Sequence, residues 1–149
     1  MPLFKRIVVG TDGSDSAREA IRQAAALARL ASAELHVVSA YEPVPPRRSE
    51  AELAGAPDDV SHEFGPREEV NFILDGAATI AADYGIETSS HPRDGDPADA
   101  ILNVADEIEA DLIVVGNKGM TGARRFLLGS VPNKVSHHAP CSVFIARTT

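Results

Sequence analysis

The chain of 149 residues has a length typical of one domain, and its 44% hydrophobic and 24% charged residues are ordinary for a globular protein. Its formal net charge of −8 argues against general binding to nucleic acids or membrane surfaces, and its one cysteine, Cys141, excludes an internal disulfide framework. Because no run of about 18 apolar residues and no signal-peptide pattern occurs, we expect a cytoplasmic protein of a single domain, 1–149.

Hydrophobic periodicity predicts strands that alternate with helices. Runs of β-branched residues predict buried strands, and apolar residues three and four positions apart predict amphipathic helices. In chain order, the predicted elements are a strand at 4–10, a helix at 14–32, a strand at 33–40, a helix at 67–85, a strand at 86–91, a helix at 96–110, a strand at 111–116, a helix at 130–138 and a strand at 141–147. Five of the ten prolines fall in 41–66, which predicts a long loop of the kind that is functional or disordered.

Residues at the ends of the predicted helices support these boundaries. Ser16 and Glu19 fit a capping box at the start of the first helix, although Ser14 or Asp15 also qualifies as the cap. Gly85 is suited to the left-handed position that follows the end of a helix.

The order of elements predicts an α/β fold. Strands that alternate with helices form a parallel sheet with helices on both faces, and right-handed crossovers make it a doubly wound open sandwich. We expect a five-stranded sheet in the order 3-2-1-4-5. The strand at 86–91 is the least apolar, so it is expected nearer an edge of the sheet.

The charge of the chain is unevenly distributed. Residues 112–149 contain no Asp or Glu and carry +5, so residues 1–111 carry −13, which is the total of −8 less +5. The basic residues of this last segment are Lys118, Arg124, Arg125, Lys134 and Arg147. A small anionic ligand is one explanation for this concentration of positive charge, and chance variation of the surface is the other.

Two strands that we expect at the centre of the sheet end in glycine, Gly10 and Gly116. The loops that follow them would face each other where the winding reverses, which is where open α/β sheets bind ligands. Glycines allow close backbone approach and an anion nest, and Gly129 with Ser130 opens a helix whose N-terminus favours phosphate. The alternative is a glycine-rich loop that serves only tight turns.

Other kinds of site are less well supported. The Walker pattern GxxxxGK[ST] is absent, and GxGxxG does not follow the first strand. The spacing of the five histidines gives no metal site, so we expect surface or helix-capping roles for them, and Cys141 is expected to be a small buried apolar residue.

Several separated motifs resemble the universal stress protein family. The segment Gly116-x2-Gly119-x9-Gly129-Ser130 matches that family's nucleotide motif G-x2-G-x9-G-[ST]. The runs IVVGTDGSDSAREAI, LHVVSAY, ADLIVVGNKG and LLGSVPNKVSHHAPCSVFIAR are similar to it in the same order, so the resemblance covers nearly the whole chain and is weakest over 41–66.

The resemblance implies an ATP-binding α/β sandwich, usually a homodimer formed through the last strand, here from Cys141 to Arg147. Asp12 would contact ribose or base, or hold Mg²⁺ through the phosphates, and Val37 would line the adenine pocket. A turn or capping role is the alternative for Asp12. The implied nucleotide contacts are Gly10, Thr11, Asp12, Val37, Gly116, Asn117, Gly119, Gly129, Ser130, Val131 and Pro132. Some relatives prefer other adenine nucleotides, including cyclic AMP.

The sequence therefore favours a regulatory stress-response protein that binds an adenine nucleotide and changes its dimer or partner contacts. A slow ATP hydrolase with Asp12 as base is the main alternative, and a scaffold that binds nothing is the third. An adenylating enzyme whose first loop reads SGGxDS fits poorly, because Asp12 would place a carboxylate where pyrophosphate must approach.

Overall fold

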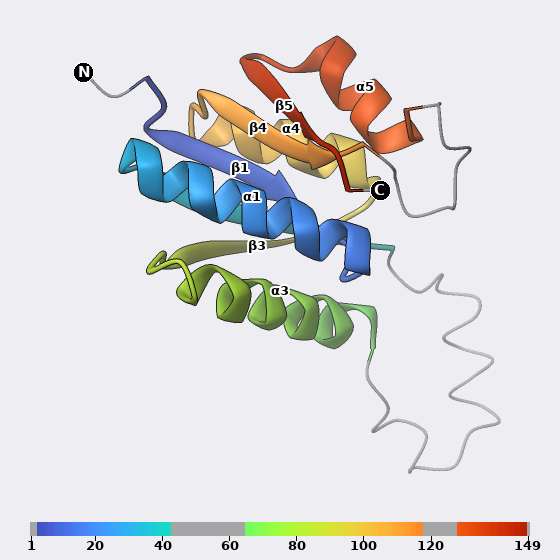
Figure 1. The fold of residues 1–149 in the computed structure, drawn as a ribbon. Helices are drawn as coiled ribbons and strands as arrows, with labels where there is room; N and C mark the ends of the chain where they lie inside the picture. Colours follow the sequence, from blue (N-terminus) through green and yellow to red (C-terminus); the bar gives the residue numbers. More distant parts are fainter. Residues whose placement is uncertain (1–2, 43–64, 118–127, 149) are drawn as a thin grey trace, which may run out of the picture.

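The computed structural model describes residues 3–42, 65–117 and 128–148 (Figure 1). Every predicted strand and helix is present. In chain order they are β1 (Arg6–Gly10), α1 (Asp15–Ala31), β2 (Glu34–Tyr41), α3 (Pro66–Ala82), β3 (Thr88–Asp94), α4 (Pro97–Glu107), β4 (Leu112–Gly116), α5 (Ser130–His138) and β5 (Ser142–Ala146). Most of the predicted loop at 41–66 lies outside the described residues. No helix within the described ranges has the length and apolar character needed to cross a membrane.

The five strands form one parallel sheet in the order β3-β2-β1-β4-β5, which confirms the predicted doubly wound topology. β1 lies in the middle, between β2 and β4. Because the chain winds outward from β1 in one direction and from β4 in the other, the carboxyl ends of these two strands flank the switch point. The topology thus brings Gly10 and Gly116, the last residues of β1 and β4, close together at the carboxyl ends of the strands, as predicted.

Helices cover both faces of the sheet (Figure 1). α1 and α3 pack on one face and α4 and α5 on the other. Successive side chains of a strand point to opposite faces, so Ile7 and Val9 of β1 join the core under α1 and α3, whereas Val8 joins the core under α4. A strand buried on both faces is continuously apolar, which is why β1 and β4 were recognisable from the sequence.

The position of β3 differs from the prediction. The strand runs to Asp94 rather than ending at His91, and it pairs with β2 from Leu35↔Thr88 to Tyr41↔Asp94. Pro92 lies inside this strand, which is tolerated because β3 is at the edge of the sheet and a proline there leaves no ladder bond unmade. The predicted edge location is confirmed.

The first helix is capped by Ser14. Its Oγ accepts a hydrogen bond from the N–H of Ala17 at 3.2 Å. The predicted capping box of Ser16 and Glu19 is wrong, because Ser16 lies inside the helix and Glu19 instead accepts a bond from Nε2 of Gln23. The alternative cap named from the sequence is therefore the correct one.

Gly85 ends α3 as predicted. Its φ is +74°, and its N–H donates to Ala82 O while the N–H of Ile86 donates to Ala81 O. This pair of bonds is a Schellman motif, which needs a residue in the left-handed region. The turn directs the chain into β3, which is the edge strand beside β2.

Candidate functional site

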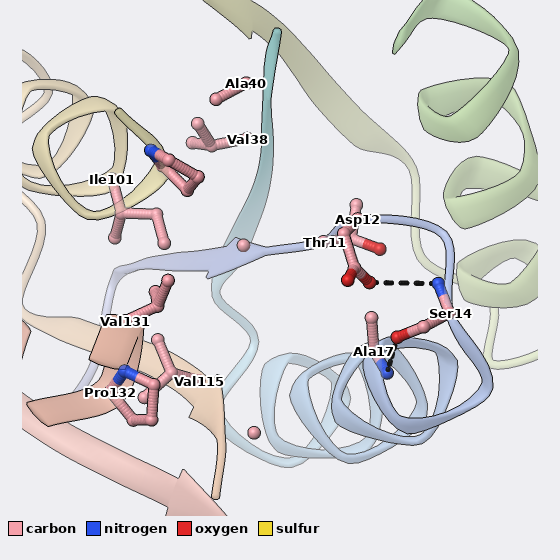
Figure 2. A pocket seen from close by; sticks show the side chains of 13 residues that line it. Thr11, Asp12, Ser14, Ala17, Val38, Ala40, Ile101, Val115, Val131 and Pro132 are labelled. Carbon is pink, nitrogen blue, oxygen red and sulfur yellow. Dashed lines mark hydrogen bonds between the residues drawn. The ribbon is translucent and has the colours of Figure 1, made fainter. Parts of the chain in front are cut away.

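A cleft lies at the carboxyl ends of β1, β2 and β4, between the start of α1 on one side and α4 and α5 on the other (Figure 2). It holds about 530 Å³ of space, part of which is open to solvent. The lining residues are Gly10, Thr11, Asp12, Ser14, Ala17, Val38, Ala40, Pro97, Ile101, Val115, Gly116, Val131 and Pro132. The cleft therefore lies at the switch point of the sheet, where sequence reasoning placed a ligand.

One side of the cleft is apolar. Val38 and Ala40 come from β2, Ile101 from α4, and Val131 and Pro132 from the first turn of α5, and Figure 2 shows these side chains around one part of the hollow. None of these side chains has a charge or a hydrogen-bonding group. Such a surface suits the flat face of an aromatic ring.

Gly10 forms part of the floor because it has no side chain. A Cβ at this position would overlap Cδ1 of Ile101, which packs directly against the backbone of β1. Gly10 thus has a packing reason rather than a need for positive φ. Sequence reasoning identified the glycine but missed Ile101, whose side chain closes the cleft from α4.

The opposite side of the cleft is polar and is organised by its own hydrogen bonds. Thr11 Oγ1 accepts the N–H of Gly13 at 3.1 Å. Asp12 Oδ1 accepts the N–H of Ser14 at 2.9 Å, a bond that Figure 2 shows. Asp12 thus forms an Asx turn, which is the turn role considered from the sequence. It is also the one acidic residue in the described lining of the cleft, so the same bond fixes the carboxylate beside the hollow.

The N-termini of three helices border the cleft, and they differ in what bonds to their first N–H groups. α4 starts there with Pro97, is capped by the Asp96 side chain and has Asp99 in its first turn. α1 is capped by the Ser14 side chain and has Asp15 in its first turn. α5 begins at Ser130 with Gly129 as its N-cap residue, and it has neither a side-chain cap nor an acidic residue in its first turn. Because the dipole and unpaired N–H groups of a helix start attract anions, α5 is the end that favours a phosphate.

Asn117 ties the end of β4 to its neighbours. Its N–H donates to Ala146 O, its Oδ1 accepts from both N and Oγ1 of Thr148 at 2.9 Å, and its carbonyl accepts the N–H of Gly129 at 3.1 Å. Asn117 was predicted as a ligand contact, but it does not line the cleft in the structure. The bonds it makes place Gly129, and with it the start of α5.

The structure places six of the eleven predicted site residues in the lining of the cleft, and Gly129 and Ser130 directly precede two of them, Val131 and Pro132. Val37 is an exception, because its side chain lies in the core under α1 and α3, and its neighbour Val38 lines the cleft instead. Val38 is the register partner of Gly10, so the two share a face of the sheet. Gly119 lies outside the described residues, as do the basic residues Lys118, Arg124 and Arg125.

Lys134 connects α5 to α4. Its Nζ lies 2.8 Å from Oδ1 of Asp99 and 3.4 Å from Oδ2 of Asp96. The hydrogen bond to Asp99 raises the pKa of Lys134, and the backbone N–H of Asp99 together with Lys134 lowers the pKa of Asp96. Lys134 therefore holds the two helices beside the cleft and is already paired, rather than directed at a ligand.

The described residues bring no three or more His, Cys, Asp or Glu side chains together in a way that could hold a metal ion. In the cleft, Asp12 offers one carboxylate with one oxygen already bonded to Ser14 N. That set fits Mg²⁺ only where phosphates and water supply most of the ligands.

The comparisons with known proteins agree with this geometry. The sequence pattern of the universal stress protein family matches residues 3–147. A universal stress protein of Mycobacterium tuberculosis strain H37Rv is 41% identical over 150 residues, and the alignment covers 100% of both chains.

Solved structures give the same result. A universal stress protein in complex with cAMP superposes with a TM-score of 0.73 at 33% identity and covers 98% of both chains. The universal stress protein from Archaeoglobus fulgidus in complex with dAMP has a TM-score of 0.67 at 28% identity and covers 96% of this chain and 98% of that one. Motif, fold and full-length similarity together show that this chain belongs to the universal stress protein family.

Proposed function

We propose that this protein binds an adenine nucleotide in the cleft. The observation that carries the proposal is the combination of an apolar slot with the uncapped, acid-free start of α5 at its border. A nucleotide needs both features, because its base is flat and weakly polar and its phosphate is an anion. The complexes of related proteins with cAMP and dAMP support the class of ligand.

The base stacks against the apolar side of the cleft, with Val38 in the role expected of Val37, and Asp12 meets the ribose. The phosphate binds at Ser130 and Val131, where the first N–H groups of α5 point outward from the helix. The remaining proposed contacts are the backbones of Gly10, Thr11, Gly116, Gly119 and Gly129 and the ring of Pro132. Asn117 acts indirectly, through the bond between its carbonyl and Gly129 N. ATP is the expected ligand of the motif-bearing branch, and Mg²⁺ would reach the site with its phosphates.

Cyclic AMP or another monophosphate is the second candidate ligand, because the two related complexes each contain an adenine monophosphate. Hydrolysis is less well supported. It needs a base that positions water, and the one acidic group lining the described cleft is held in a turn by Ser14 N. The function proposed is therefore regulatory binding in the cytoplasm, with occupancy changing the contacts of a single-domain protein.

Isothermal titration with ATP, AMP and cyclic AMP tests the proposal, with GTP at equal phosphate charge as the control for the base. We expect heat from at least one adenine nucleotide and weaker binding of GTP. Absence of heat from all three adenine nucleotides contradicts the proposal. The identity of any nucleotide released from denatured, freshly purified protein provides an independent measurement.

The contact surface proposed to respond to the nucleotide is β5. It is an edge strand, and its Phe144 and Ile145 are 38% and 39% exposed, so a second copy can pair with it and cover them. We expect Phe144→Glu to convert a dimer to a monomer in sedimentation equilibrium. Phe72→Glu is the matched control, because Phe72 is 74% exposed on α3, away from β5. A monomeric wild type, or a variant that remains dimeric, contradicts this interface.

A further inference from the structure

Two histidines that are 55 positions apart in the sequence meet at the β2–β3 edge. Nδ1 of His36 and Nε2 of His91 are 2.9 Å apart, and the ring centroids are 5.1 Å apart. His36 is only 7% exposed, so the surface or capping role expected for it from the sequence is wrong. Sequence spacing gave no signal, because the contact depends on the register of two neighbouring strands.

Glu34 fixes the direction of the hydrogen bonds. Its Oε1 lies 3.1 Å from Nε2 of His36, and an ionised carboxylate only accepts, so Nε2 of His36 carries the proton. In the neutral ring Nδ1 of His36 is then an acceptor, and Nε2 of His91 must donate to it. The chain His91→His36→Glu34 is thus complete when both rings are neutral. One added proton, at Nδ1 of His91, keeps both hydrogen bonds but places a charge on a partly buried ring, so it already weakens the arrangement.

A second added proton is not compatible with this arrangement. With both rings charged, every ring nitrogen carries a hydrogen, so Nδ1 of His36 and Nε2 of His91 become two donors facing each other. Two positive charges also face each other in a half-buried site. The pair must then separate, and His91 is the ring with a route to solvent because it lies on the edge strand.

Charged groups from β1, β2, β3 and α4 lie near the pair. From β1, Arg6 lies 3.7 Å from Glu34 of β2, and from β3, Arg93 forms a 2.9 Å ion pair with Glu107 of α4. Burial lowers the pKa of His91 most, the charges of His36 and Arg93 lower it further, and Glu107 opposes them. The folded chain therefore favours the uncharged form of this ring.

We propose that His36 and His91 form an acid-sensitive latch that holds β3 against β2 at neutral pH and releases this edge of the sheet as pH falls. Because the pKa of His91 is below its ordinary value of 6.5, the stabilisation is fully present above pH 6.5 and is lost as pH falls below it, through the pKa of the folded state. The folded protein takes up fewer protons than the unfolded chain over that interval, so acid favours unfolding.

The latch is next to the cleft. His91 is the register partner of Val38, whose side chain lines the cleft and whose carbonyl accepts the N–H of Thr11 at 2.9 Å. Release of β3 therefore disturbs the strand that supports both the apolar side and the Thr11–Asp12 turn. The expected consequence is weaker nucleotide binding in acid, and this consequence alone rests on the proposed function.

Urea unfolding at pH 7.5 and pH 5.5, without nucleotide, tests the latch in the full chain. We compare the wild type with His91→Gln, which keeps an N–H donor but does not titrate. The control is His138→Gln, which makes the same change on an exposed residue of α5. We expect acidification to raise the unfolding constant of the wild type and of His138→Gln several-fold more than that of His91→Gln. An equal change of the unfolding constant with pH in all three proteins overturns the proposal. If His91→Gln does not fold, His36→Gln is measured in its place.

A parallel titration with AMP at both pH values tests the link to the cleft. We expect the affinity of the wild type to fall several-fold at pH 5.5 and that of His91→Gln to stay nearly constant. Equal losses in both proteins overturn the link. If the wild type binds no adenine nucleotide at either pH, the proposed function fails, and the unfolding result without nucleotide still decides the latch.

Discussion

Replacing Ser130 with aspartate is expected to weaken ATP binding by about tenfold or more without loss of the fold. Ser130 is the first residue of α5, is exposed and directly precedes the lining residue Val131, so an added carboxylate would stand where we propose that the phosphate binds. Repulsion between unit charges about 4 Å apart costs roughly 1–4 kcal/mol depending on solvent screening, and exposure places this case at the lower end. An acid in the first turn also stabilises a helix by about 0.3–1 kcal/mol, so the variant should unfold no more easily than the wild type.

Ligands of different charge distinguish repulsion by the carboxylate of Ser130→Asp from a distortion of the cleft, because repulsion depends on the phosphates and a distortion does not. The loss should be largest for ATP, smaller for AMP and close to zero for adenosine, all measured by isothermal titration. Ser136→Asp is the matched control, because it adds the same charge to an exposed residue nearer the other end of the same helix. An equal loss for adenosine and ATP, or an equal loss in the control, contradicts a phosphate site at the start of α5.

Gly10→Ala is expected to destabilise the protein by about 1–3 kcal/mol, because the added methyl group overlaps Cδ1 of Ile101 in a packed site. The strain should largely disappear in the background of Ile101→Val, which lacks that carbon. Ile101→Val alone costs about 0.5–1.5 kcal/mol. Urea unfolding of the four proteins in this cycle measures the coupling, which we expect at about 1 kcal/mol or more.

The same substitution also tests the cleft. Moving Ile101 away from the methyl group narrows or reshapes the apolar side, so Gly10→Ala should weaken binding of adenosine as well as of ATP. Gly76→Ala is the control for stability, because a Cβ at this position in α3 meets nothing within 4 Å and alanine favours the helix by up to about 1 kcal/mol. Additive costs in the cycle would show that Gly10 and Ile101 are not packed as described.

Much of the architecture could be predicted because its causes are local. β1 and β4 are short apolar runs that end in glycine, and α1 is an alanine-rich stretch with a cap at its start. Alternation of such elements leaves few topologies, since crossovers are right-handed, and the strand order followed from that. The end of β3 was predicted too early, at His91, because a proline usually ends a strand. An edge strand tolerates one, and β3 continues through Pro92 to Asp94.

The sequence by itself thus determined the fold class, the strand order, the family and the end of the sheet at which the cleft forms. These follow from periodicity, glycine placement and motif spacing, which are properties of residues near one another in the sequence. Only the tertiary structure decided that Val38 rather than Val37 faces the cleft, that Ile101 packs on Gly10, and that His36 meets His91. Each of these depends on which face a side chain takes and on the register between separate strands and helices. A shift of one residue reverses the face of a strand residue, so such contacts are fixed by packing of the whole sheet rather than by local sequence.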